Sequence, residues 1–176
     1  MNYINKLGLI LFVIFIFSCS KNYDGVSEKF IQTNNPELVN KRIDFVEKDY
    51  FKVNDFTNNN NNKNIKILKL INTSCTSCFL EMEKWKKHIK EKNILENLSV
   101  RFLAIGDYNS YFRSVVKDYN YPFEIYLDSI DTFLSKNNFI YNPLETFWLG
   151  DNDTIVMIKS PLENKLMLEL LKSKMK

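Results

Sequence analysis

The stretch IKILKLINTSCTSCFLEMEKW, residues 65–85, decides how the rest of this sequence is interpreted. Its first part, Ile65 to Ile71, is a short apolar run bounded by polar residues, which predicts a buried β-strand. Cys75 and Cys78 follow after a short polar loop. The apolar residues beyond the loop recur at helical spacing, with lysines on the opposite face, and are Cys78, Met82, Trp85 and Ile89. The stretch therefore predicts a strand, a loop with the first cysteine, and an amphipathic helix docked on a sheet.

Downstream of this stretch the sequence continues to alternate between strand and helix patterns. Strands are expected at 98–105, 123–127, 146–149 and 154–158, and helical turns at 108–119 and 131–137. A closing helix is expected to present Leu162, Leu166, Leu170 and Leu171 on one face. The segment 150–153 separates the last two strands and is typical of a hairpin. This order predicts an α/β fold with a central mixed β-sheet flanked by helices.

Upstream, the pattern is weaker. Residues 42–56 alternate apolar and charged side chains, which favours an N-terminal strand or hairpin, and the Asn-rich stretch 58–64 is expected to be a loop. The polar residues 19–40 suit a tether. The folded domain is accordingly expected to span residues 41–176, with a short extension before it.

The N-terminus has the features of a targeting segment. An apolar run from Leu7 to Phe17 follows Lys6, which fits a secretory signal and is too short to span a bilayer as a helix. The sequence Ile16-Phe-Ser-Cys19 resembles the bacterial lipobox, in which the cysteine is lipidated and becomes the first residue of the mature chain. We therefore expect a lipoprotein signal peptide at 1–18 and a lipid anchor on Cys19. The alternative is an ordinary signal with an incidental cysteine.

Composition limits the possible classes of function. Lys and Arg number 24 against 21 Asp and Glu, so a formal net charge of only +3 argues against a nucleic-acid binder. Hydrophobic residues make up 45% of the chain, enough to build a packed core. Of the three cysteines, Cys19 would carry lipid, which leaves Cys75 and Cys78 as one pair in an oxidising, exported context.

The cysteine pair is the one motif with a chemical mechanism. A thiol at a helix N-terminus lies among unpaired backbone N–H groups and the positive end of the helix dipole, and both favour the nucleophilic thiolate. Cys75 would then attack a disulfide, and Cys78, one turn inside the helix, would resolve the mixed disulfide. Zinc would need more ligands than two cysteines and one histidine, and covalent haem a histidine in place of Phe79. A structural disulfide remains an alternative.

The segment 67–85 resembles the active-site region of the thioredoxin-like superfamily, closest to the TlpA/ResA-type envelope thiol-disulfide oxidoreductases. The match includes Glu81 and an apolar Trp85 after the cysteines. Further matches are the Tyr121-Pro-Phe segment with Asp128, and the hairpin sequence from Thr146 to Val156. The resemblance covers residues 65–175 and implies a thioredoxin-like fold with Cys75 and Cys78 as the redox pair.

Three positions depart from that family's pattern. Ser74 replaces the usual tryptophan before the first cysteine, and Glu83 replaces a proline in the helix. Lys69 stands where thioredoxin has a buried acid; we expect it to face solvent, with no proton acceptor there and slow release of the mixed disulfide. The superfamily's cis-proline binds substrate backbone beside the disulfide, and the resemblance assigns that role to Pro143.

These observations lead to the expectation of a lipid-anchored thiol-disulfide oxidoreductase, of undetermined direction, in the cell envelope and facing the periplasm. Its partners would be thiols or disulfides of envelope proteins and a membrane electron donor or acceptor. No cofactor, metal or nucleic acid is expected. The alternative is a non-catalytic thioredoxin-fold lipoprotein that acts as a binding or scaffold module.

Overall fold

The structure, a computed structural model, describes residues 35–57, 65–92, 98–140, 142, 144–163 and 165–174. The predicted signal peptide, the lipidation residue Cys19, the loop at 58–64 and Pro143 lie outside the described residues. The predicted tether is described from Asn35 onward.

Strands and helices alternate along the described chain. The strands are β1 (Phe51–Lys52), β2 (Ile65–Asn72), β3 (Leu98–Ile105), β4 (Glu124–Asp128), β5 (Thr146–Leu149) and β6 (Ile155–Ile158). The helices are α2 (Thr76–Lys92), α3 (Ser110–Tyr119), α4 (Thr132–Lys136) and α5 (Lys165–Lys174), with 3-10 turns η1 (Pro36–Leu38), η2 (Glu47–Asp49) and η4 (Asp151–Asp153). Each predicted strand and helix downstream of residue 65 is therefore confirmed, with small shifts at its ends.

The described strands form one mixed sheet in the order β1-β4-β3-β2-β5-β6. β2 pairs with β3, and β3 with β4, in parallel, so the chain must cross the sheet through α2 and α3 between them. Right-handed crossovers that step in one direction place both helices over the same face. β5 and β6 then add antiparallel strands as the predicted hairpin, and β1 pairs antiparallel with β4 at the other edge. β2 is thus a central strand, and the loop that leaves it leads to Cys75 and then into α2, which contains Cys78.

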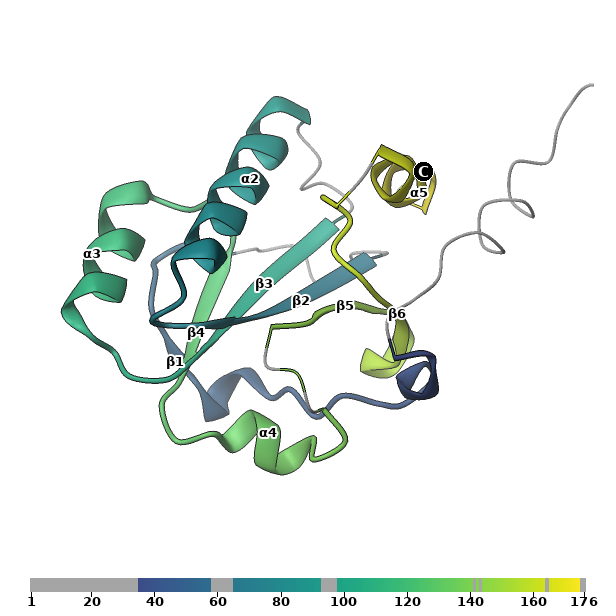
Figure 1. The fold of residues 1–176 in the computed structure, drawn as a ribbon, viewed down its shortest axis with the longest axis horizontal. Helices are drawn as coiled ribbons and strands as arrows, with labels where there is room; N and C mark the ends of the chain where they lie inside the picture. The colour runs from purple at the N-terminus through teal and green to yellow at the C-terminus, as the bar shows by residue number, and fades with distance from the viewer. Residues whose placement is uncertain are drawn as a thin grey trace, which may run out of the picture. The chain divides into compact units, whose positions relative to one another are not determined.

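Helices cover both faces of the sheet. Figure 1 shows α2, α3 and α5 over one face and α4 on the opposite face. Met82 and Trp85 of α2 are 0% exposed, as the helical spacing predicted. The α4 face holds a cluster of buried apolar side chains to which Leu38, before β1, also belongs. The predicted mixed sheet flanked by helices is confirmed.

The N-terminal segment differs from the predicted hairpin. Only β1 is a strand, and Arg42 adds an isolated antiparallel bridge to Thr154. Asn137, which is fully buried, holds the segment by accepting a hydrogen bond from the Asp44 N–H (2.8 Å) and donating one to its carbonyl (3.1 Å). The backbone of this segment is therefore paired with distant parts of the chain, and a local alternation of side chains could not reveal those partners.

The closing helix also departs from the prediction at two positions. Leu162 lies in a turn before α5 and not in the helix. α5 buries Met167, Leu170 and Leu171, whereas Leu166 is 49% exposed. Because α5 begins at Lys165, Leu166 lies in its first turn and on the outer side, and Met167 takes the inner position.

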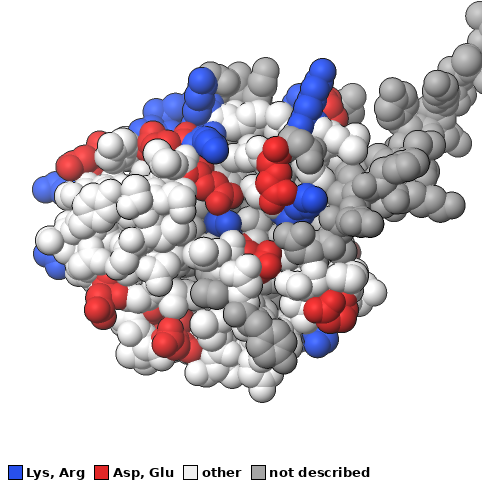
Figure 2. Space-filling view, viewed as in Figure 1, with Lys and Arg blue, Asp and Glu red and all other residues white. Residues whose placement is uncertain are grey.

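On the face shown in Figure 2, acidic and basic side chains are interspersed.

Candidate redox site at the N-terminus of α2

A short turn after β2 places Cys75 directly before α2. The Asn72 side chain accepts a hydrogen bond from the Ser74 N–H (2.8 Å), and the Asn72 carbonyl accepts one from the Cys75 N–H (3.1 Å). Asparagine commonly stabilises turns in this way, by bonding to the backbone two residues on. α2 then begins at Thr76, so Cys75 occupies the N-cap position.

Cys75 and Cys78 form a disulfide, with their Cα atoms 5.3 Å apart. Cys75 Sγ accepts a hydrogen bond from the Cys78 backbone N–H (3.2 Å), the bond that an N-cap side chain makes to the third residue of a helix. The Ser77 hydroxyl lies 3.2 Å from the same sulfur. Cys75 is half-buried, whereas Cys78 is only 5% exposed. The two sulfurs therefore have different environments, and the outer one faces the helix N-terminus.

Gly106, at the end of β3, supports this turn from the neighbouring strand. Its φ of +121° is a conformation that side chains other than hydrogen rarely adopt. A Cβ at this position would lie 2.7 Å from the hydroxyl of Thr73, which is 2% exposed. The close approach of Gly106 to Thr73 fixes the path of the chain between β2 and Cys75.

Aromatic packing fixes the first turn of α2 against α3. Phe79, directly after Cys78, is 6% exposed and lies 5.3 Å from Tyr111 and 6.1 Å from Phe112, centroid to centroid. On the outer side of this turn of α2, Leu80 is 61% exposed. Tyr111, on α3, is 51% exposed. Phe79 therefore packs the first turn of α2 against α3, and exposed apolar side chains lie close to this contact.

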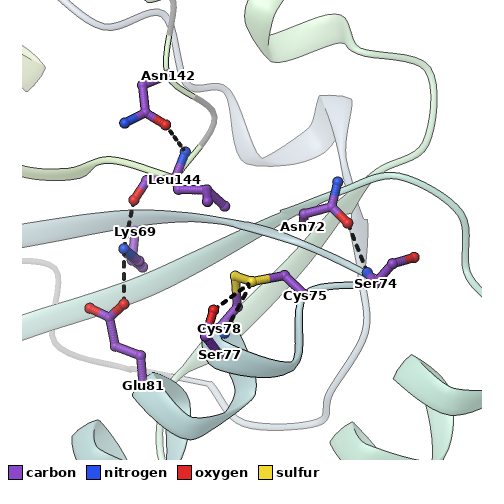
Figure 3. Close-up of a disulfide and its surroundings, with 9 residues drawn as sticks. All are labelled: Lys69, Asn72, Ser74, Cys75, Ser77, Cys78, Glu81, Asn142 and Leu144. Carbon is purple, nitrogen blue, oxygen red and sulfur yellow. Dashed lines mark hydrogen bonds and ion pairs between the residues drawn. A yellow bond between two sulfur atoms is a disulfide. The ribbon is translucent and has the colours of Figure 1, made fainter.

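Lys69, on β2, is buried rather than exposed to solvent, so our expectation for it was wrong. Its residue exposure is 6%, and its ammonium lies 3.0 Å from Glu81 Oε2 and donates a 2.7 Å hydrogen bond to the Leu144 carbonyl. Glu81 Oε1 also accepts a hydrogen bond from the Ser160 hydroxyl (3.0 Å). Figure 3 shows this ion pair beside the disulfide. An acid is thus present near the cysteines, but it comes from α2 and not from the strand.

The segment before β5 is held by its own polar contacts. Asn142 accepts a hydrogen bond from the Leu144 N–H (3.0 Å) and donates one to Glu145 Oε1 (3.0 Å). The Glu145 carbonyl accepts one from the Leu70 N–H (2.9 Å). The neighbouring Pro143, to which the resemblance assigns substrate binding, lies outside the described residues, so its role stays a prediction.

No group of three or more histidine, cysteine, aspartate or glutamate side chains within the described ranges is arranged to hold a metal ion. None of the helices in the described part of the chain combines the length and the apolar character needed to cross a bilayer.

Comparisons with known proteins agree with the fold. No protein-family model and no curated protein sequence matches the chain. Among solved structures, a thioredoxin-like protein in its oxidised form aligns with 79% of this chain and 96% of its own, at a TM-score of 0.56 and 11% identity. A candidate thiol:disulfide interchange protein DsbE from Chlorobium tepidum aligns with 64% of this chain and 80% of its own, at a TM-score of 0.52 and 10% identity.

A third structure, the thioredoxin domain of a thiol-disulfide oxidoreductase from Bacteroides vulgatus, aligns with 64% of this chain and 79% of its own, at a TM-score of 0.50 and 10% identity. Likeness at such low identity shows architecture and not activity. The chain has the thioredoxin-like fold, with a disulfide-bonded Cys75-x-x-Cys78 pair at the N-terminus of α2.

Proposed function

We propose that this protein is a thiol-disulfide oxidoreductase that exchanges electrons with exported proteins through Cys75 and Cys78. The observation that carries the proposal is the position of Cys75: its sulfur caps α2 and accepts the Cys78 N–H at 3.2 Å. A negative thiolate at this position would gain both the hydrogen bond and the helix dipole. The site therefore favours the ionised form that attacks disulfides.

The exchange balances without any cofactor. With the pair reduced, the Cys75 thiolate attacks one sulfur of a substrate disulfide, and the other substrate sulfur leaves as a thiolate and takes up a proton. Cys78 then loses its proton and attacks Cys75 Sγ, which breaks the mixed disulfide and releases the second substrate sulfur as a thiol. Two electrons and two protons pass to the substrate, and the Cys75–Cys78 disulfide forms. The same steps in reverse oxidise a substrate dithiol.

The different burial of the two sulfurs suits these roles. Cys75 is half-buried and reachable by a protein substrate, whereas Cys78, at 5% exposure, is reachable mainly by its neighbour. Two of the compared structures are described as a candidate thiol:disulfide interchange protein and a thiol-disulfide oxidoreductase, which supports the same chemistry for this chain.

The proposal places the protein in the cell envelope, facing the periplasm and anchored by lipid on Cys19. The support is the sequence alone: an apolar run from Leu7 to Phe17 precedes a lipobox-like Ile16-Phe-Ser-Cys19. Its partners would then be thiols or disulfides of envelope proteins, together with a membrane-bound donor or acceptor of electrons. A lipid anchor holds a protein at a membrane without a spanning helix.

A trapping experiment tests the proposal. Cys78→Ser leaves the nucleophile but removes the resolving thiol, so mixed disulfides with client proteins should accumulate in intact cells. Cys75→Ser is the matched control and should trap nothing. The proposal fails if Cys78→Ser captures no client while Cys75→Ser leaves the cells unaffected. That result would favour the non-catalytic binding or scaffold role.

A further inference from the structure

The ion pair between Lys69 and Glu81 is an unusual feature of the core. Lys69 lies on β2, a strand that is paired on both sides, and its side chain is only 8% exposed. Burying two charges costs several kcal/mol per ion unless the pair and its hydrogen bonds compensate for the lost water. Both charges here are compensated, by each other, by the Leu144 carbonyl and by the Ser160 hydroxyl.

The pair lies next to the buried cysteine. Glu81 follows Cys78 by three positions in α2, and side chains with that spacing are neighbours on a helix surface, with Cβ atoms about 5–6 Å apart. Lys69 reaches Glu81 from the strand beneath the helix, at 3.0 Å. The ammonium and the carboxylate therefore lie together on one side of the disulfide, as Figure 3 shows.

A cavity beside the pair is also lined by Ser77, the residue whose hydroxyl contacts the outer cysteine. Lys69 and Glu81 line a cavity of about 360 Å³ together with Ser77, whose hydroxyl lies 3.2 Å from Cys75 Sγ. The other charged groups that line it are Lys84, Glu145 and Glu163. The Lys69 side chain is buried and that of Glu81 is partly buried, so salt screens both charges less than it screens surface charges, and both can act on the sulfurs.

We propose that the Lys69–Glu81 pair sets the redox equilibrium of the Cys75–Cys78 disulfide, with Lys69 as the positioning residue that balances the carboxylate beside Cys78. This inference rests on the proposed function. The disulfide carries no charge, whereas the reduced form carries a thiolate, so nearby charges act on the reduced form alone. The ammonium stabilises that form and the carboxylate destabilises it. Their separate removal must therefore shift the equilibrium in opposite directions.

The equilibrium with glutathione measures this shift. Oxidised glutathione and the protein dithiol convert to two reduced glutathione molecules and the Cys75–Cys78 disulfide, with two electrons and two protons transferred. Lys69→Met leaves Glu81 unbalanced and should favour the disulfide by about tenfold in the equilibrium constant, about 30 mV for a two-electron couple. Glu81→Gln leaves the ammonium unbalanced and should favour the dithiol by a similar factor. The double variant should lie within about threefold of the unsubstituted protein.

A second ion pair on the same strand provides the control. The ammonium of Lys66 lies 3.0 Å from Asp153. Lys66 precedes Lys69 by three residues on β2, and because side chains alternate along a strand, the two lysines point to opposite faces of the sheet. Lys66→Met should leave the glutathione equilibrium unchanged. If Lys69 served folding alone, Lys69→Met would lower the free energy of unfolding. The two single variants would then not shift the glutathione equilibrium in opposite directions.

The outcomes separate this inference from the function on which it rests. If the unsubstituted full-length protein does not exchange with glutathione, both the proposed function and the inference are overturned. If it exchanges, but the Lys69 and Glu81 variants shift the equilibrium in the same direction or not at all, only the inference is overturned. Should Lys69→Met not fold, Glu81→Gln decides alone, because an unchanged equilibrium there contradicts the proposal.

Discussion

The backbone N–H of Cys78 donates a hydrogen bond to Cys75 Sγ over 3.2 Å, so one cysteine of the pair caps the helix in which the other is buried. In most helices this position belongs to an oxygen of serine, threonine, aspartate or asparagine. A sulfur at this position accepts a hydrogen bond from the same N–H group and lies at the positive end of the helix dipole. When the disulfide is reduced, these interactions favour a negative charge on Cys75.

The first prediction follows from this asymmetry. In the reduced protein at pH 7, iodoacetamide should alkylate Cys75 at least about tenfold faster than Cys78, since the outer sulfur is the more ionised and the more exposed. Peptide mass spectrometry of timed samples measures both rates. The mechanism is wrong if Cys78 reacts first, or if neither cysteine reacts below the pH at which a free thiol does.

A second prediction concerns Asp128, at the end of β4. Its carboxylate, 2% exposed, accepts hydrogen bonds from the Thr132 N–H (2.9 Å) and the Phe133 N–H (2.7 Å) at the start of α4. Asp128→Ala should lower the free energy of unfolding by about 2 kcal/mol, because two buried N–H groups lose a charged acceptor. Urea unfolding measures the change.

Asp131 provides the control for Asp128. It occupies the N-cap position of α4, but its side chain makes no capping hydrogen bond and is exposed. Asp131→Asn should therefore change the free energy of unfolding by less than about 0.5 kcal/mol. Equal effects of the two substitutions would show that the carboxylate of Asp128 is not what holds α4.

A third prediction concerns stability at alkaline pH. Burial raises the pKa of Tyr50, Tyr121 and Tyr126 above the usual value of about 10. Above pH 10 these phenols stay protonated in the folded protein and ionise in the unfolded chain, so the unfolded state binds fewer protons. The free energy of unfolding must then fall as pH rises, by up to about 1.4 kcal/mol per pH unit for each phenol.

Tyr121→Phe tests this dependence, because it removes one phenol that is 1% exposed. Between pH 10 and 12 the decline of the unfolding free energy should become shallower by up to about 1.4 kcal/mol per unit. Tyr119→Phe, which changes a side chain that is 46% exposed, should leave the slope nearly as it is. An unchanged slope for Tyr121→Phe would refute the assignment.

A fourth prediction concerns the membrane anchor. If Cys19 is lipidated, the full-length protein should partition with membranes and incorporate radiolabelled fatty acid. Cys19→Ala should abolish the labelling and leave the unfolding of the thioredoxin-like unit unchanged. Labelling that persists in Cys19→Ala would rule out the lipobox assignment.

Much of the fold could be predicted because its signals are local. The apolar run at β2, the helical spacing of Met82 and Trp85, and the turn residues between β5 and β6 each depend on neighbours along the chain. The N-terminal segment could not be predicted, since two hydrogen bonds between the Asn137 side chain and the Asp44 backbone hold it. Such a pairing between distant residues has no periodic pattern in the sequence.

The site was predictable in part for the same reason. The spacing of Cys75 and Cys78 before a helix indicated both the motif and its position. The partners of Lys69 did not follow from the sequence, because Glu81, Leu144 and Ser160 meet only through the fold. The position of Lys69 between Leu68 and Leu70 was a signal, but it did not identify the partner. Because Lys69 is buried against a carboxylate, the expectation of slow resolution has lost its premise.

The most direct measurement of the central claim is electron exchange between the full-length protein and a synthetic peptide that contains one disulfide, followed from both directions. Reduced protein with oxidised peptide, and oxidised protein with reduced peptide, should reach the same equilibrium. Each Cys75–Cys78 disulfide formed should match one peptide disulfide lost, and Cys75→Ser should abolish the exchange. If the pair remains accessible to dithiothreitol, but neither mixture transfers electrons to or from the peptide, the account of Cys75 and Cys78 as an exchange site is contradicted.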